Sequence, residues 1–349
     1  MKFVLTPIYF IVAMLVFTAC DDAQKPSNEH SDRVKMMIAQ SKLAKDPHSF
    51  SKPNDVRVTH LNWNAAVDFE KKIITATATY DLMHLTKSDR VIFDMKGLKI
   101  SSVVVDGKSA QFEIGEEKEF IGAPLTVILD STAKQVAIHY ETTPGAEALL
   151  WVDGEKPFLF TQSQAILART WIPCQDSPGL RITYDAKVKV RQDLMALMSA
   201  ENPTSKSSDG VYTFKMDKPI PSYLLALAVG DVEFQSIGDR TGVYATPNVI
   251  DAAAYEFEDM QKMLEAAEKL YGEYAWGRYD VLVLPAAFPF GGMENPKLTF
   301  ATPTIIAGDK SLVSLIAHEL AHSWSGNLVT NSTWNDFWLN EGFTVYFEE

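Results

Sequence analysis

Cysteine is scarce in this sequence, which has Cys20 and Cys174 among its 349 residues. If Cys20 carries a lipid, as considered below, no disulfide can form within the chain. A protein of this length that is 46% hydrophobic has enough apolar side chains to fold without such cross-links. We therefore interpret Cys174 as a buried structural thiol, and the length suggests about two domains.

Runs of basic residues are also missing, because 32 Lys and Arg face 45 Asp and Glu, for a formal net charge of −13. A surface that binds nucleic-acid phosphates needs clustered Lys and Arg, so nucleic acid is excluded as a partner. The acidic residues are spread along the chain, which is typical of a soluble surface.

The chain begins with a targeting pattern. Lys2 precedes an apolar run at residues 3–17, and small residues lead to Cys20. The run is short for a membrane-spanning helix and Pro7 interrupts it, so residues 1–20 are predicted to be a secretory signal. Cys20 stands where a bacterial lipoprotein carries its lipid, although Phe17 replaces the usual Leu. We expect an exported protein, periplasmic or on the cell surface, that is anchored to a membrane through Cys20; a plain signal peptide or an uncleaved anchor is the alternative.

The rest of the chain has no internal repeat and no low-complexity tract. Residues 21–45 are polar and predict a linker with one helical stretch at 33–45. Between 46 and 245, short alternating apolar runs bounded by Gly, Asp, Asn and Pro predict a β-rich domain. The clearest of these runs are residues 73–80, 91–95, 102–105, 135–140 and 187–190.

The pattern changes near residue 246, where a second domain is predicted to begin. Residues 251–271 have an apolar stripe at helical spacing, residues 280–285 read as a strand, and 312–328 as a helix. Another helix is predicted to start at Asp336. Strands followed by helices predict an α+β fold.

The most specific motif is His318-Glu319-Leu320-Ala321-His322. Residues four apart share one face of a helix, so both imidazoles can reach one cation. Glu319 can then hold a metal-bound water and accept its proton. The alternatives to a metal site are an accidental pentapeptide and a pair of core histidines. The presence or absence of a third ligand decides between these interpretations.

A catalytic zinc site needs three protein ligands. One class of site would require glycine and histidine where this chain has Ser325 and Leu328, so that class is excluded. A glutamate on the next helix defines the other class, and Glu341 follows His322 after 18 intervening residues. We therefore predict one Zn²⁺ per chain at His318, His322 and Glu341. Asp336 or Asn340 either hydrogen-bonds a ligand histidine or caps the second helix.

A glycine-rich segment follows the strand at 280–285. Gly291 and Gly292 can let a substrate backbone come close, and the carboxylate of Glu294 can bind an α-ammonium group. Alone, this segment could be an incidental turn. Beside a zinc site, it indicates an enzyme that holds the N-terminus of a peptide.

Together these motifs resemble the M1 family of zinc aminopeptidases, in particular its leukotriene A4 hydrolase branch. The similarity extends over nearly everything after residue 45. The segments that carry it are DPHSF (46–50), TQSQA (161–165), PCQDSP (173–178), FPFGGMENP (288–296), LTF (298–300), AGDKSL (307–312), HSWSGNLVTN (322–331) and Trp338-Leu339-Asn340-Glu341-Gly342.

The resemblance implies an N-terminal β saddle domain followed by a thermolysin-like zinc peptidase domain. It implies that Gln162 and Gln164 line the pocket for the first substrate residue, that Glu294 anchors the amino terminus, and that the adjoining Gly291, Gly292 and Met293 bind substrate. Phe290 departs from the branch, which often has Tyr there.

The resemblance also implies a longer protein, because the peptidase domain is truncated and an oxyanion-stabilising tyrosine is missing. We expect a zinc-dependent aminopeptidase that acts on peptides with a free N-terminus. A catalytically weak or inactive fragment, or an epoxide hydrolase in the same site, is the alternative.

Overall fold

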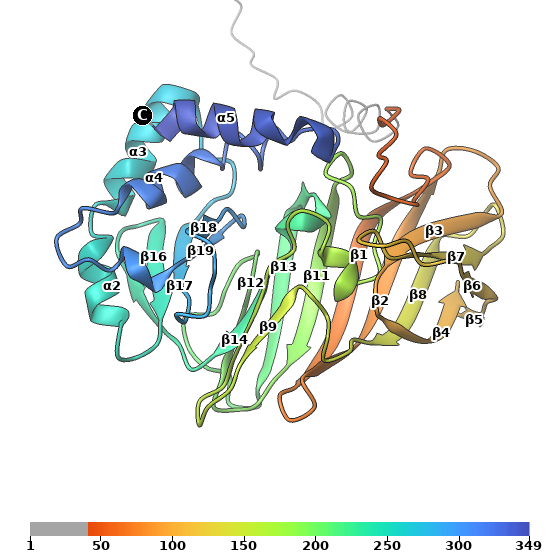
Figure 1. The fold of residues 1–349 in the computed structure, drawn as a ribbon, viewed down its shortest axis with the longest axis horizontal. Helices are drawn as coiled ribbons and strands as arrows, with labels where there is room; N and C mark the ends of the chain where they lie inside the picture. The colour runs from red at the N-terminus through yellow and green to blue at the C-terminus, as the bar shows by residue number, and fades with distance from the viewer. Residues whose placement is uncertain (1–40, 349) are drawn as a thin grey trace, which may run out of the picture. The chain divides into compact units, whose positions relative to one another are not determined.

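The computed structural model describes residues 41–348, whose arrangement is drawn in Figure 1. The predicted signal segment, Cys20 and nearly all of the predicted linker lie outside the described residues. Leu43, from the end of that linker, exchanges two hydrogen bonds with Asn54: Leu43 N donates to Oδ1 at 2.8 Å, and Nδ2 donates to the Leu43 carbonyl at 2.9 Å. The last residues of the predicted linker therefore contact the folded part.

The largest sheet of the described chain has seven strands in the order β13-β11-β1-β2-β8-β4-β5. Its pairs are antiparallel except for β1 with β11, which run parallel. Buried residues alternate with partly or fully exposed ones along β11, as expected for a sheet with one face on a core. The strands of this sheet are β1 (Val56–Asp68), β2 (Ile73–His84), β4 (Lys99–Val105), β5 (Lys108–Ser109), β8 (Gln135–Glu141), β11 (Ile182–Lys189) and β13 (Val211–Ile220).

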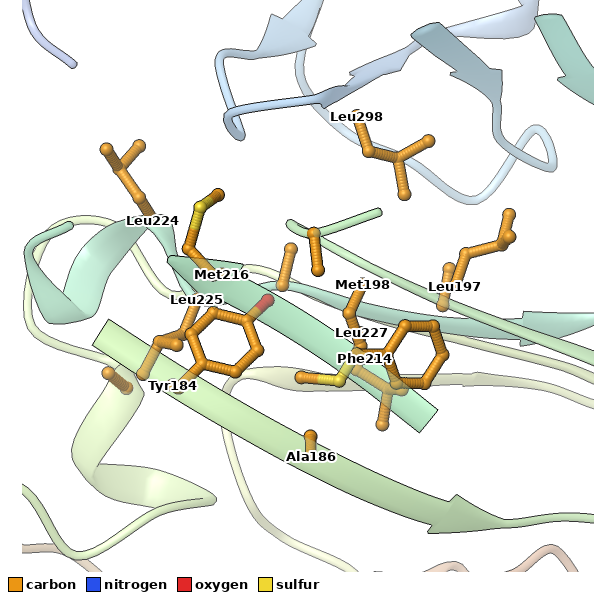
Figure 2. Packing of buried hydrophobic residues seen from close by; sticks show 14 of the residues in the cluster. Tyr184, Ala186, Leu197, Met198, Phe214, Met216, Leu224, Leu225, Leu227 and Leu298 are labelled. Atoms are coloured by element: carbon orange, nitrogen blue, oxygen red, sulfur yellow. The ribbon is translucent and has the colours of Figure 1, made fainter. Parts of the chain in front are cut away.

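Two smaller sheets complete the β-rich domain. They are β3-β7-β6, with β3 (Arg90–Met95), β6 (Phe112–Ile114) and β7 (Ala123–Ile128), and β12-β14-β10-β9, with β9 (Leu149–Val152), β10 (Phe158–Thr161), β12 (Met195–Met198) and β14 (Leu227–Gly230). Figure 2 shows that Tyr184 and Phe214 of the large sheet face Met198 and Leu227, a cross-strand pair of the four-stranded sheet. These apolar faces form one buried core. Four of the five predicted strands lie within observed ones, and the fifth, at 187–190, runs one residue past the end of β11.

The second domain has a five-stranded sheet in the order β15-β16-β17-β19-β18. Strands β16, β17 and β19 are parallel, and β18 is an antiparallel edge strand. Leu298 of β19 reaches the core drawn in Figure 2, so the two domains share apolar packing. The elements here are β15 (Glu233–Ser236), β16 (Thr241–Ala245), β17 (Tyr279–Val283), β18 (Gly292–Met293), β19 (Leu298–Ala301), α2 (Ile250–Glu256), α3 (Met260–Tyr271), α4 (Ser314–Ala321) and α5 (Phe337–Glu348).

Four short 3-10 helices join these elements: η1 (Ala168–Thr170), η2 (Ser222–Leu224), η3 (Pro303–Ile305) and η4 (Trp334–Asp336). The α+β class is confirmed, with a β-rich N-terminal domain before a partial peptidase domain of sheet and helices. Strands β15 and β16 belong to the sheet of the second domain, although both precede the predicted boundary at residue 245.

The single helix predicted at 251–271 is wrong, because the structure has α2 and α3 with a break between them. At the break, Met260 N bonds to the carbonyl of Phe257, three residues back instead of four, which tightens the turn. The carboxylate of Glu256, which ends α2, turns inward and accepts the backbone N–H groups of Gly308 and Lys310, both at 2.8 Å. This tertiary contact replaces continuation of the helix.

The helix predicted at 312–328 is too long, since α4 ends at Ala321. Gly326 has a φ of +113°, which a helix cannot contain, and Asn327 N bonds to the carbonyl of His322 at 2.9 Å. The chain then curls back, as Gly326 N bonds to the Val329 carbonyl at 2.7 Å.

Cys174 is buried, and burial raises the pKa of its thiol well above the usual value, so its interpretation as a structural thiol is confirmed. None of the helices in residues 41–348 has the length and hydropathy to cross a membrane.

Candidate metal centre and substrate site

The three predicted ligands converge on one point. His318 and His322 lie one turn apart on α4 and its C-terminal cap, and their Nε2 atoms are 3.1 Å apart. Helix α5 packs beside α4 and brings the Oε2 atom of Glu341 to 3.6 Å from Nε2 of His318 and 3.7 Å from Nε2 of His322. Ligand atoms of all three residues lie within 4.8 Å of one another.

Hydrogen bonds on the far side of each ring fix the histidines. Nδ1 of His322 lies 3.0 Å from the Ser325 carbonyl and 3.0 Å from Oγ1 of Thr344. Because a carbonyl only accepts, Nδ1 carries the proton of the neutral ring and the lone pair is on Nε2. Nδ1 of His318 bonds to the carboxylate of Glu348. Both rings therefore present Nε2 toward Glu341, as a metal site requires.

These partners were not predicted from the sequence, although Thr344 and Glu348 follow Glu341 at three and seven residues, one helical face. Of the two alternatives for Asp336 and Asn340, the hydrogen bond to a ligand histidine is not made among the described residues. Asp336 ends η4, and the Asn340 side chain donates instead to the Tyr223 hydroxyl at 3.4 Å.

The donor set fits zinc. Two imidazole nitrogens and one carboxylate are a ligand combination of catalytic zinc sites, which keep a further position open. Two more buried carboxylates, those of Glu294 and Glu319, lie within 4.8 Å of a His322 ring nitrogen. Such a concentration of negative charge favours a cation.

The pKa values of the site reflect this crowding. Burial raises the pKa of Glu319 to about 8, and burial also raises that of Glu294. Burial alone would lower the pKa of His322, but Glu294, Glu341 and Glu319 raise it to about 10. Burial opposes ionisation of Glu341, yet hydrogen bonds from His318 and His322 hold its pKa at about 2. A proton and a metal ion compete for Nε2 of His322, so metal binding releases protons here.

The glycine-rich segment lies against the predicted base. A Cβ atom on Gly292 would be 2.1 Å from Oε1 of Glu319, so any other residue here would force Glu319 or β18 to shift. The other carboxylate oxygen of Glu319 is buried and has no hydrogen-bond partner among the described residues. Such an unpaired oxygen beside a metal site is available to a water molecule.

The β-rich domain also contributes to this site. Just beyond β10, Nε2 of Gln162 lies 3.3 Å from Sδ of Met293, and Nε2 of Gln164 donates to Oε1 of Glu294 at 3.3 Å. Glu294 is 4% exposed. The structure thus brings together the residues predicted from the zinc motif, the glycine-rich segment and the two glutamines.

A β-rich N-terminal domain that contacts a helix pair carrying a His-His-Glu cluster is typical of a metallopeptidase. The chain belongs to peptidase family M1. The Peptidase M1 N-terminal domain matches residues 57–224, and the Peptidase family M1 domain matches residues 255–349.

Individual relatives lie in the leukotriene A4 hydrolase and leucine aminopeptidase 2 branch. The chain is 45% identical over 320 residues to leukotriene A-4 hydrolase of Xenopus laevis. The matched region covers 87% of this chain and 52% of that protein. It is 42% identical over 314 residues to leucine aminopeptidase 2 of Yarrowia lipolytica, covering 87% and 48%. The structure of native yeast LTA4 hydrolase superimposes with a TM-score of 0.83 at 40% identity, over 90% of this chain and 51% of that one. The chain therefore spans about half the length of the relatives it matches.

Proposed function

We propose that the protein is part of a zinc-dependent aminopeptidase that removes N-terminal residues from peptides. One observation carries the proposal: Glu294, a buried carboxylate suited to an ammonium group, lies within 4.8 Å of the ring of the metal ligand His322. A peptide whose amino terminus is held there can place only its first peptide bond at the metal. The aminopeptidase name of a 42% identical relative supports the same activity.

When bound at His318, His322 and Glu341, zinc supplies a Lewis acid that polarises the scissile carbonyl and acidifies water. Glu319 accepts a proton from the attacking water and delivers it to the leaving amine. Burial supports this role because it raises the pKa of the carboxyl, which makes its carboxylate a stronger base.

Glu294 binds the substrate ammonium, and the bond from Gln164 orients its carboxylate. Strand β18 supports the peptide backbone, because the sheet order leaves one side of β18 without a neighbouring strand in the described chain. An extended peptide can add to such an edge through main-chain hydrogen bonds.

The test uses a full-length protein and the Glu319→Gln variant, which removes a base but no ligand. We expect unchanged zinc content and loss of aminoacyl-amide hydrolysis. Near-normal turnover by this variant would show that Glu319 is not the base. Glu294→Ala should reduce hydrolysis of free-amine substrates most, and N-acetylated substrates should be poor for the unmodified protein; equal losses on both would make Glu294 structural.

Epoxide hydrolysis in the same site is the second candidate, favoured by the 45% identity to a protein named leukotriene A-4 hydrolase. Turnover of an epoxide substrate that is abolished by removal of zinc would support it. Phe290 offers no hydroxyl to an epoxide substrate. Turnover that is unaffected by metal removal would refute epoxide hydrolysis in this site.

We also propose export and lipid attachment at Cys20, from the apolar run and the small residues before this cysteine. Metabolic labelling with a radioactive fatty acid should mark the protein, and Cys20→Ser should abolish the label. An equally labelled Cys20→Ser variant would refute lipid attachment at this residue.

A further inference from the structure

The loop that follows the metal helix is held by the β-rich domain. Between α4 and α5, the carbonyls of Gly326, Asn327 and Leu328 accept hydrogen bonds from that domain. The Tyr223 hydroxyl donates to Gly326 O at 3.3 Å, while Nη1 of Arg181 donates to Asn327 O at 2.8 Å and Nη2 to Leu328 O at 3.2 Å. Three successive carbonyls are thus fixed from outside their own domain.

Arg181 is suited to this task. It stands directly before β11, and its remaining contacts are to the Pro219 carbonyl at 3.3 Å and to the Thr330 hydroxyl. All these acceptors are uncharged. The guanidinium therefore uses its N–H groups to hold carbonyls and one hydroxyl in place, and it does not neutralise a carboxylate. A planar fork with a full charge makes stronger and more directional bonds than a neutral donor.

Asn327 connects this clamp to the reaction site. Its backbone N–H donates to the carbonyl of the metal ligand His322 at 2.9 Å. Its side-chain Nδ2 donates to the backbone carbonyl of Glu294 at 2.7 Å. Asn327 is 1% exposed, so water does not compete for either bond. One residue therefore touches the metal ligand and the amine anchor while Arg181 holds its own carbonyl.

We propose that Arg181 is a positioning residue that acts through Asn327 to fix Glu294 relative to His322. The proposal rests on the proposed function, because the distance between Glu294 and the metal decides which peptide bond is cut. The β-rich domain thereby helps to decide which peptide bond is cut, through a residue that touches neither substrate nor metal.

Amide hydrogen exchange on the purified 349-residue chain tests the coupling without any need for peptidase activity. Arg181→Met should accelerate exchange in residues 326–330 and also in 292–295, each by about tenfold, which corresponds to about 1.4 kcal/mol. Strand β17, which Arg181 does not contact, should keep its rate. Arg191→Met is the matched control, since Arg191 is exposed and pairs with Asp193 on the surface of the β-rich domain.

Asn327→Ala should accelerate exchange in 292–295, and adding Arg181→Met to it should produce no further change in that segment. An unchanged rate in 292–295 for Arg181→Met would overturn the proposal, as would equal acceleration throughout the chain, β17 included. If Arg181→Met does not fold, Arg181→Lys decides, because it keeps the charge but cannot hold both the Asn327 and the Leu328 carbonyl with one planar group. That variant should give the same pattern at smaller amplitude, and acceleration confined to 326–330 would overturn the coupling.

In a full-length protein, Arg181→Met should raise KM for free-amine substrates about tenfold, with unchanged zinc content and little change in kcat. Arg181→Lys, which keeps the charge, should recover part of the loss. If the unmodified protein shows no preference for free amines, the proposed function fails on that measurement, whereas the exchange pattern still decides the coupling.

Discussion

Replacing Gly292 by alanine would push a methyl group against the side chain of Glu319, which we propose as the base. The added Cβ would lie 2.1 Å from Oε1, 2.4 Å from Cδ and 2.7 Å from Cγ of Glu319. Carbon and oxygen atoms that are not bonded need more than 3 Å, so Glu319 or β18 must move by about 1 Å. Glu319 is 5% exposed on a packed helix, which leaves its carboxylate little space to retreat.

A displacement of this size in a reacting group costs about 100-fold in rate. We therefore expect Gly292→Ala in a full-length protein to lower kcat for an aminoacyl amide about 100-fold, while zinc content by metal analysis stays the same. Two alanine variants serve as controls. At Gly291 the nearest atom to an added Cβ is Cδ1 of the flexible Leu315 side chain at 3.2 Å, and at Gly342 no described atom lies within 4 Å.

Gly291→Ala should lose less activity than Gly292→Ala. Gly342→Ala, one residue from the ligand Glu341, should keep its activity and gain about 1 kcal/mol in helix stability. Wild-type turnover by Gly292→Ala, measured on a folded and zinc-loaded protein, would refute the contact between this strand and the base.

Three further predictions follow from other parts of the chain. Single alanine variants of His318, His322 and Glu341 should each bind less than one equivalent of zinc, and full zinc content in all three would exclude the site. Arg240 and the Tyr274 N–H hold the pKa of Glu268 at about 2, so Glu268 should stabilise the fold above pH 4.5 and lose this contribution as the pH falls toward 2. Glu268→Gln should therefore unfold more easily by about 1 kcal/mol at pH 7 and by almost nothing at pH 2, in denaturant titrations at each pH; an equal loss at both values would refute the ionic origin. Residues 1–349 alone should show little aminopeptidase activity, because Trp338 and Tyr346 of α5 are 68% and 74% exposed, and Leu339, Phe343 and Phe347 of the same helix line an open apolar cavity of about 500 Å³; turnover comparable to a full-length protein would contradict this.

The parts of the site that could be predicted from the sequence depend on local geometry. A spacing of four places His318 and His322 on one helical face whatever surrounds them. Glu341 could be predicted because zinc needs a third ligand and the intervening chain is long enough to turn back. Thr344 and Glu348 follow the same periodicity and could have been found by extending the face of α5.

The parts that could not be predicted depend on contacts between distant residues. An apolar stripe continues through residues 251–271, yet the inward turn of Glu256 toward Gly308 interrupts the helix. The early end of α4 similarly depends on hydrogen bonds within the loop after His322. No pattern in the sequence indicates that Gly292 lies against Glu319 or that Arg181 holds the loop.

The placement of the ligands on two helices has a consequence for the mechanical integrity of the chain. His322 and Glu341 are separated by 18 residues, so a cation that both hold closes a loop of that length. Closing such a loop removes conformations from the unfolded chain, as a disulfide does in proteins that have cysteines to pair. The melting temperature should then vary with the free zinc concentration. A chelator should lower it, because removal of the ion also removes the cross-link. In a chain whose one described cysteine is a buried single thiol, zinc held at the proposed site would be the cross-link of the second domain.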